Sequence, residues 1–237
     1  MPGDITASNI GEFIRSNSCE RRFKLDVDDR AKAKEVPFAE RLFNSLDPVL
    51  RAQGRRREDD WEDSLRLAGL ADLTRYDRNA KLHDPKARTE TPLGEFLRAL
   101  SQVTDGEDAY GREIQLDSTV CAHQIKARAD FILLRWHDGK PKLLIVECKA
   151  SRKDRTYHRI QLALYQMILY REAAAGRIVV GQHRLGEADI LAIVARIDES
   201  TNGIQALLSG LKSLQINGFR LPFNFPTSKF GCKARQI

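Results

Sequence analysis

The fold of this chain is decided by residues 128–149, which read RADFILLRWHDGKPKLLIVECK. Two short, apolar, β-prone runs flank the segment 137–140, and Asp138-Gly139 between such runs is a strong signal for a tight hairpin. We therefore expect two antiparallel strands joined by a two-residue turn. Pro141 follows the turn closely, so a longer loop is the alternative.

The expected hairpin carries charged side chains inside apolar strands. Glu147 and Lys149 project from one face, because side chains alternate along a strand. If Asp138-Gly139 is the turn, the numbers of paired residues sum to 277. Asp130 then lies opposite Glu147, with their Cβ atoms about 5 Å apart. A longer loop would shift this register.

Two carboxylates held this close repel each other unless a cation lies between them, and hard oxygen ligands favour Mg²⁺ or Mn²⁺. Lys149 can hold an attacking water and stabilise charge on a phosphate, which suits phosphodiester hydrolysis. The alternative is an ordinary exposed Glu-x-Lys charge pair. A charge inside a strongly apolar strand is costly, however, so a functional site is the better explanation.

Apolar spacing around the hairpin predicts an α/β fold. We expect a third strand within 112–122 and two more at 178–183 and 190–197. The helices are expected at 5–25 with Thr6 or Ser8 as N-cap, within 38–70 with a break at Asp47-Pro48, and at 92–103, 157–175 and 203–214. The order of helices, three strands, helix and strands is that of an α/β sandwich.

Length and composition fit one domain with a real core. The chain has 237 residues, of which 42% are hydrophobic. We expect one domain over 1–237, with a helical N-terminal part to about 105, a catalytic core at about 106–200, and a helix and tail at 201–237. Because no terminating element precedes Ile237, this domain could be the leading part of a longer protein.

The charge balance favours a polyanionic partner, since 39 Lys and Arg stand against 33 Asp and Glu, with a net charge of +6. Two basic segments flank the acids and comprise Arg55, Arg56, Arg57, Arg152, Lys153, Arg155 and Arg159. Phosphate-backbone contact is the functional interpretation, and a solvated basic face is the alternative. We find no leader pattern and no long apolar run, so we expect no membrane partner and a cytoplasmic location.

Four short motifs occur in order between residues 54 and 165. They are Gly54-x-x-x-Glu58, Ala129-Asp130, Glu147-x-Lys149 and Gln161-x-x-x-Tyr165. In this order they resemble the PD-(D/E)xK nucleases, and within that superfamily the RecB-like branch. The opening ITASNI at 5–10 and CERRF at 19–23 also look like the start of RecB-like domains. Ala129 is a departure, because such families often carry glycine there.

The resemblance implies a restriction-endonuclease-like core, with a central mixed β-sheet flanked by helices and a helical N-terminal part. It implies that Asp130 and Glu147 bind the metal, that Lys149 positions the water, and that Glu58 reaches the metal directly or through water. Gln161 and Tyr165, one helical turn apart, would complete the catalytic groove. The alternatives are a capped, half-buried helix face and, for Tyr165, plain core packing.

The implied activity is a Mg²⁺- or Mn²⁺-dependent deoxyribonuclease, an exonuclease by preference, in DNA repair, recombination or defence. A fused or associated helicase would fit as a partner. The alternatives are a catalytically inactive nucleic-acid-binding module on the same fold and a scaffold protein. Other common enzyme classes are disfavoured, because the chain lacks G-x-x-x-x-G-K-[ST], H-E-x-x-H and G-x-S-x-G motifs.

Some members of this branch hold an iron–sulfur cluster with one early and three late cysteines. Cys19 and Cys232 stand near such places, but Lys229 occupies the position three before Cys232. Four ligands are therefore not available in this chain. We expect no cluster unless sequence beyond Ile237 supplies the others. The four cysteines form no CxxC, so a zinc ribbon or a disulfide framework is not indicated.

Overall fold

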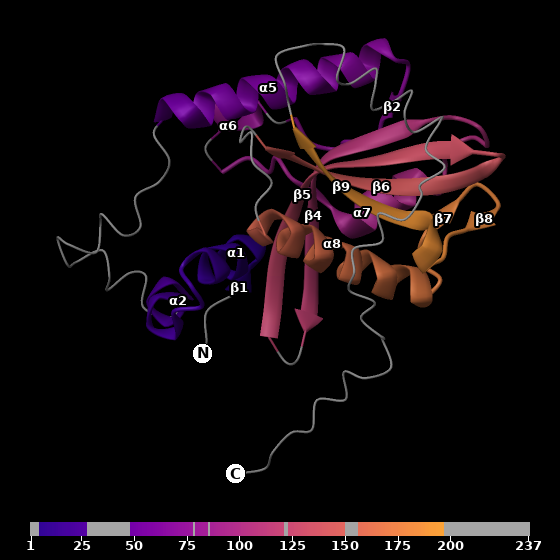
Figure 1. Cartoon of the computed structure of the whole chain (residues 1–237). Coiled ribbons are helices and arrows are strands. Elements are labelled where there is room, and N and C mark those ends of the chain that lie inside the picture. Colours follow the sequence, from indigo (N-terminus) through magenta and orange to yellow (C-terminus); the bar gives the residue numbers. More distant parts are fainter. Residues whose placement is uncertain are drawn as a thin grey trace.

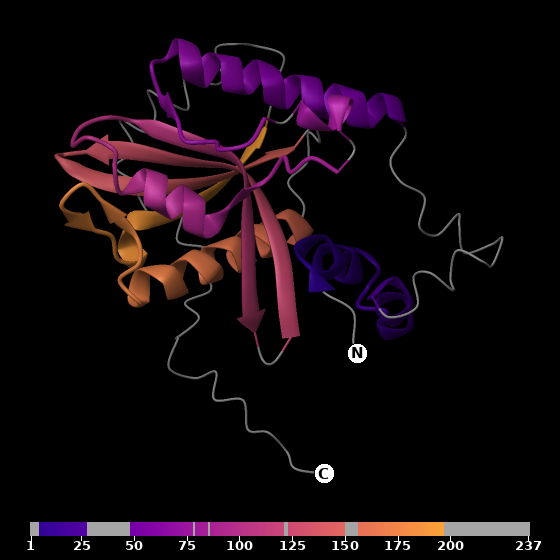
Figure 2. The same cartoon turned by 180° about the vertical axis from the view of Figure 1, so that it is seen from behind.

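Figure 1 shows the computed structural model of the chain, in which a β-sheet lies between helical layers. The structure describes residues 5–27, 48–77, 79–84, 86–120, 123–149 and 156–196. Helix α5 (Pro48–Leu67) covers one face of the sheet, and α7 (Leu93–Leu100) and α8 (Thr156–Ala174) cover the other (Figures 1 and 2). The expected α/β architecture, a central mixed sheet flanked by helices, is confirmed.

The main sheet has the strand order β2-β4-β5-β6-β9, with β1 paired to β5 and β3 paired to β4. Its long strands β4 (Ala109–Val120), β5 (His123–His137) and β6 (Lys140–Lys149) are consecutive and antiparallel. Strand β9 (Ile190–Arg196) runs parallel to β6. A parallel pair needs a crossover connection, and α8 provides it.

The β5–β6 hairpin has the turn and the register that the sequence predicts. Asp138 and Gly139 have φ of 50° and 71°. Positive φ at both central residues is the requirement of a type I′ turn. The ladder runs from His137↔Lys140 to Phe131↔Val146, so paired numbers sum to 277 throughout. Pro141 pairs in the same register with Trp136 and does not lengthen the loop.

The strands of the hairpin are apolar on both sides because both faces of the sheet are covered. Ile132 and Ile145 belong to the core beneath α7 and α8. Phe131 and Val146 belong to a second core beneath α5, where the Trp61 and Phe131 rings meet edge to face with centroids 4.5 Å apart. Continuous apolar runs are typical of strands buried on both faces.

The first N-terminal helix packs against α8, and the second packs against the first. Helix α1 (Ala7–Arg15) begins after Thr6, and its first turn is closed by a capping box: the Asn9 backbone N–H donates to Thr6 Oγ1 at 3.1 Å, and the Thr6 backbone N–H donates to Asn9 Oδ1 at 2.8 Å. Thr6 is thus the N-cap. Helix α2 (Glu20–Val27) follows, and α1 packs against α8.

Several expectations about secondary structure were incomplete or wrong. The strand expected at 178–183 is two separate strands, β7 (Val179–Val180) and β8 (His183–Arg184), which form their own small sheet, because Gly181 reverses the chain with φ of 52°. The N-terminal part also contains β1 (Ile5–Thr6), β2 (Ala71–Asp72), β3 (Thr91–Pro92) and α6 (Ala80–His83). Elements this short leave no periodic pattern.

Other expectations were confirmed or fall outside the described residues. Helix α5 begins at Pro48, in agreement with the break expected there, and proline suits the first helical position. The segment 28–47 and the helix expected at 203–214 lie outside the described residues. Among the helices that the structure describes, none is long and apolar enough to cross a membrane.

Candidate active site

The two acids of the hairpin lie just beyond the regular β5–β6 ladder. The last ladder pair is Phe131↔Val146, so the next position in this register brings Asp130 beside Glu147. The Cys148 backbone N–H donates to Oδ2 of Asp130 at 2.8 Å, which fixes that carboxylate against β6. Glu147 is only 1% exposed. The Asp130 carboxylate thus lies against β6 next to Glu147, and the direct pairing of the two carboxylates stays a prediction.

Helix α8 brings Gln161 and Tyr165 to the same place. Tyr165 is buried, and Gln161 Nε2 donates to its phenolic oxygen at 2.8 Å. Burial raises the pKa of Tyr165, and the negative charges of Glu147 and Asp130 raise it further. The phenol therefore lies within electrostatic reach of both acids and stays protonated. Tyr165 also packs in the core beneath α8, which agrees with the alternative of plain core packing.

Glu58 approaches the acids from the opposite layer. It lies on α5, and burial together with the negative charge of Asp130 raises its pKa to about 7, while Arg112 acts to lower it. The acid of α5 and the acid of β5 thus influence each other, although they lie far apart in the sequence. In the described part of the chain, however, no three His, Cys, Asp or Glu side chains are grouped closely enough to hold a metal ion.

A fourth acid, Glu113, lies on strand β4 at the position opposite Asp130. The β4–β5 ladder includes Arg112↔Phe131 and Ile114↔Ala129, so Glu113 and Asp130 occupy the position between them. Glu113 has φ of 51°, which is rare for a residue with a side chain and takes this position out of the ladder. Its charge also contributes to the raised pKa of Glu58.

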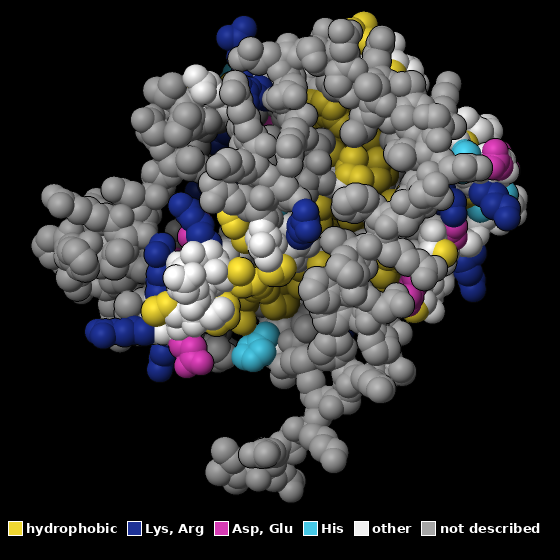
Figure 3. Space-filling view, in the orientation of Figure 1, with side chains coloured by type: hydrophobic (Ala, Val, Ile, Leu, Met, Phe, Trp, Pro, Cys, Tyr) yellow, Lys and Arg dark blue, Asp and Glu magenta, His cyan; other side chains and the backbone are white. Residues whose placement is uncertain are grey.

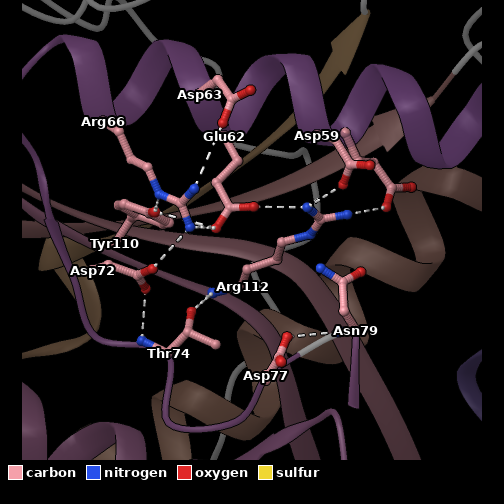
Figure 4. A network of polar contacts seen from close by, with 11 residues as sticks. Asp59, Glu62, Asp63, Arg66, Asp72, Thr74, Asp77, Asn79, Tyr110 and Arg112 are labelled. Atoms are coloured by element: carbon pink, nitrogen blue, oxygen red, sulfur yellow. Dashed lines mark hydrogen bonds and ion pairs between the residues drawn. The ribbon is translucent and has the colours of Figure 1, made fainter. Parts of the chain in front are cut away.

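A network of charges joins α5 to β4 beside these acids (Figure 4). Arg112 Nη1 donates to Asp59 Oδ1 at 2.7 Å and to Glu62 Oε2 at 2.8 Å, and Nη2 donates to Glu58 Oε2 at 3.2 Å. On its other side, Glu62 accepts from Arg66 at 3.0 Å and from the Tyr110 hydroxyl at 3.2 Å. Glu62 and Arg112 are both buried.

The sequence interpretation missed Arg112 and Glu113. A signal was available, because this pair interrupts the apolar pattern of β4 just as Asp130 interrupts that of β5. The pattern alone does not say which partners such residues meet. The partners of Arg112 lie on α5, 50 to 54 residues away in the chain, whereas Glu113 pairs with Arg128 on β5.

The remaining candidate residues are placed only in part. Lys149 is the last residue of β6, two positions after Glu147, and its side chain lies outside what the structure describes. The segment with Arg152, Lys153 and Arg155 also lies outside the described residues. The described basic residues are the exposed Arg55, Arg56 and Arg159 and the partly buried Arg57, which lie on α5 just before Glu58 and on α8 just before Gln161.

Comparison with known proteins gives one family. The model of the PD-(D/E)XK nuclease superfamily matches residues 12–234, which is nearly the whole chain. The matched span includes all four motifs between residues 54 and 165. Neither the curated proteins nor the solved structures contain a match.

Proposed function

The chain belongs to the PD-(D/E)XK nuclease superfamily, and on this basis we propose that it is a Mg²⁺- or Mn²⁺-dependent deoxyribonuclease. Asp130, Glu147 and Lys149 would form its reaction centre. The observation that carries the proposal is the approach of Glu58 on α5 to Asp130 on β5, close enough for the charge of Asp130 to raise the pKa of Glu58, with the Asp130 carboxylate bound to β6 next to Glu147. The RecB-like branch is part of the proposal and rests on the order of the four motifs.

The donor set fits a hard divalent cation. Asp130 and Glu147 offer carboxylate oxygens at one end of the hairpin, and Glu58 would reach the ion directly or through water. The like-charge repulsion felt by Glu58 would be relieved by a cation at this place. When bound, such an ion supplies Lewis-acid polarisation of the phosphodiester and of the attacking water.

The side chains around the acids would orient the substrate. Lys149 would hold the attacking water and stabilise negative charge that develops on the phosphate. Because Gln161 Nε2 donates to the Tyr165 oxygen, the phenolic hydrogen can be directed to a substrate oxygen. Gln161 would thus orient the phenol of Tyr165.

A DNA substrate is supported by the basic residues around the acids. Exposed arginines precede Glu58 on α5 and Gln161 on α8, and the segment 152–155 adds further basic residues in sequence. Lys and Arg side chains also gather over α1 and α2, at the left of the face shown in Figure 3. Such side chains bind the phosphate backbone irrespective of base sequence. A role in repair, recombination or defence, with a helicase as partner, belongs to the same proposal.

One observation favours a second candidate, a nucleic-acid-binding module without catalysis. Among the described residues, no group of three or more His, Cys, Asp or Glu side chains lies close enough together to hold a metal ion. In that case Asp130 and Glu147 would hold no ion. Binding of Mg²⁺ distinguishes the two candidates without any assay of cleavage.

We expect Mg²⁺ to raise the melting temperature of the wild-type chain but not that of Asp130→Asn, because only the wild type offers both carboxylates. At a hundredfold excess of free Mg²⁺ over its Kd, linkage adds about 2.7 kcal/mol, or roughly 5–10 °C in Tm. Thermal denaturation followed by circular dichroism measures the shift. Asp117→Asn, an exposed acid elsewhere on β4, is the matched control and should respond like the wild type. If Mg²⁺ raises the melting temperature of wild type and of Asp130→Asn equally, the ion does not bind at this site.

We expect the fourfold alanine variant of Arg152, Lys153, Arg155 and Arg159 to bind DNA more weakly, by a similar factor for unrelated sequences. The slope of log Kd against the logarithm of the salt concentration should decrease by about 0.9 for each duplex phosphate that the variant no longer binds. Fluorescence anisotropy across a salt series measures both effects. Lys140→Ala with Arg184→Ala removes exposed charge elsewhere and serves as the control. If the affinity for DNA and the salt slope are unchanged, the DNA does not pass these residues, and the path along Arg55, Arg56 and Arg57 is favoured instead.

A further inference from the structure

Arg112 is a buried cation that the proposed reaction does not use. Its side chain is only 5% exposed. Arginine stays charged at any physiological pH, so burial is tolerated only where acids and hydrogen-bond acceptors surround the guanidinium. The role of Arg112 is therefore determined by the acids that it binds.

The guanidinium reaches three carboxylates on two successive turns of α5. Nη2 binds Glu58 Oε2 at 3.2 Å, and Nη1 binds Asp59 and Glu62 at 2.7 and 2.8 Å (Figure 4). The planar fork of arginine fixes the direction of each of these bonds, which a single ammonium group would not do. One side chain on β4 thereby holds the proposed metal-binding acid of α5.

The same residue is tied to the strand that carries Asp130. Arg112 pairs with Phe131 across β4 and β5, and its guanidinium lies over the Phe131 ring, 5.5 Å from the centroid. Asp130 directly precedes Phe131. The backbone of Arg112 is held in addition by its N–H, which donates to Thr74 Oγ1 at 3.0 Å. Arg112 thus connects the helix acid to the position of the strand acid through direct contacts.

The charges near Arg112 show what its loss would do. Glu58, Asp59 and Glu62 on α5 face a sheet that carries Asp130 and Glu113 nearby. Without the guanidinium these carboxylates repel one another across the layer, and α5 loses its ion pairs to Arg112 on β4, although the hydrogen bonds of Glu62 and Arg66 to Tyr110 remain. Because three carboxylates surround the guanidinium, it repels a nearby cation weakly. Misplacing Glu58 is therefore the larger effect.

We propose that Arg112 is a positioning residue of the metal site: it holds Glu58 on α5 at a fixed place relative to Asp130 and so determines the affinity for the divalent cation. This inference rests on the proposed function. Arg112 acts through Glu58 and is not itself expected to contact the ion or the DNA. Its contribution should appear in metal affinity and much less in the rate at saturating metal.

The test is calorimetric titration of Mn²⁺ into the full chain without DNA, combined with cleavage rates at increasing Mn²⁺. Arg112→Met is expected to bind Mn²⁺ about tenfold more weakly, while its kcat at saturating Mn²⁺ stays within a few-fold of wild type. Arg66→Gln is the matched control, because Arg66 belongs to the same network but pairs with Glu62, Asp63 and Asp72. It should bind Mn²⁺ within twofold of wild type.

A double variant separates positioning of Glu58 from general stabilisation. If Arg112 acts through Glu58, Arg112→Met with Glu58→Gln should bind Mn²⁺ no more weakly than Glu58→Gln alone. The inference would be overturned if the losses of Mn²⁺ affinity in the two single variants multiply in the double variant. Wild-type or tighter Mn²⁺ affinity in Arg112→Met would also overturn it.

Should Arg112→Met fail to fold, Arg112→Lys keeps the charge without the planar fork of arginine. Arg112→Lys is then expected to bind Mn²⁺ about threefold more weakly than wild type. Wild-type affinity for Mn²⁺ in this variant would overturn the inference. A wild-type chain that binds no Mn²⁺ would instead reject the proposed function itself.

Discussion

Replacing Asp130 or Glu147 by alanine is expected to abolish metal-dependent DNA cleavage, with a loss of at least about a thousandfold, while the protein stays folded. Each substitution removes one of the two carboxylates that would bind the cation. It also relieves repulsion between them, so the melting temperature without metal should stay level or rise slightly. Cleavage rates with Mn²⁺, together with thermal denaturation, measure both parts of the prediction.

Variants that preserve shape make this result sharper. Asp130→Asn keeps an oxygen that can accept the Cys148 backbone N–H, which now donates to Oδ2 of Asp130 at 2.8 Å. Glu147→Gln fills the same buried space as Glu147, which is 1% exposed. Both should therefore be stable and inactive. Full activity in either variant would remove that residue from the metal site.

Lys149→Ala is expected to lose cleavage by about a hundredfold to a thousandfold while it keeps both Mn²⁺ and DNA binding. A cation that orients the attacking water contributes more to the transition state than to the bound ground state. Calorimetry with Mn²⁺, anisotropy with DNA and single-turnover cleavage separate the three quantities. If affinity for Mn²⁺ falls as far as the rate does, Lys149 supports the site and does not act on the water.

Lys142→Ala provides a matched control on the same strand. Lys142 lies earlier on β6, and its Nζ pairs with Asp189 Oδ1 at 2.7 Å. This pair lies away from Asp130 and Glu147. Its loss should leave cleavage within twofold of wild type. Normal cleavage by Lys149→Ala would leave Lys149 no role beyond that of a charge partner of Glu147 and would contradict the proposed mechanism.

The central hairpin could be predicted from sequence because its information is local. Asp138-Gly139 specifies a type I′ turn, and that turn fixes the pairing of every residue from His137 back to Phe131. Continued by one position, this register predicts Asp130 beside Glu147, and the bond from the Cys148 backbone N–H to Asp130 agrees with that prediction. The continuous apolar runs on either side of the turn reflect two covered faces, which the two cores confirm.

The short strands and the charge network could not be predicted in the same way. Strands β1, β2 and β3 have two residues each and exist because a long neighbour offers a pairing edge. The partners of Arg112 lie on another element, and no local pattern relates an arginine on one strand to acids more than 50 residues earlier. Tertiary packing makes this contact.

The helix residues of the candidate site show both outcomes. The spacing of Gln161 and Tyr165 predicted that they share one face of α8, and their hydrogen bond agrees. Their nearness to Asp130 and Glu147 depends on how α8, which connects β6 to β9, packs on the sheet. The spacing of residues within the helix does not predict that packing. The motif order supplied that expectation, and the raised pKa of Tyr165 is consistent with it.

The most direct test of the central claim is incubation of the purified chain with linear and circular DNA, single- and double-stranded, in Mg²⁺, in Mn²⁺ and in EDTA. The proposed function predicts cleavage of at least one linear substrate with metal, none in EDTA, and none by Glu147→Gln under any condition. Circular substrates would show whether cleavage begins at ends. The proposed function would be contradicted by DNA that stays intact with both metals although the folded protein binds it, or by equal cleavage in EDTA.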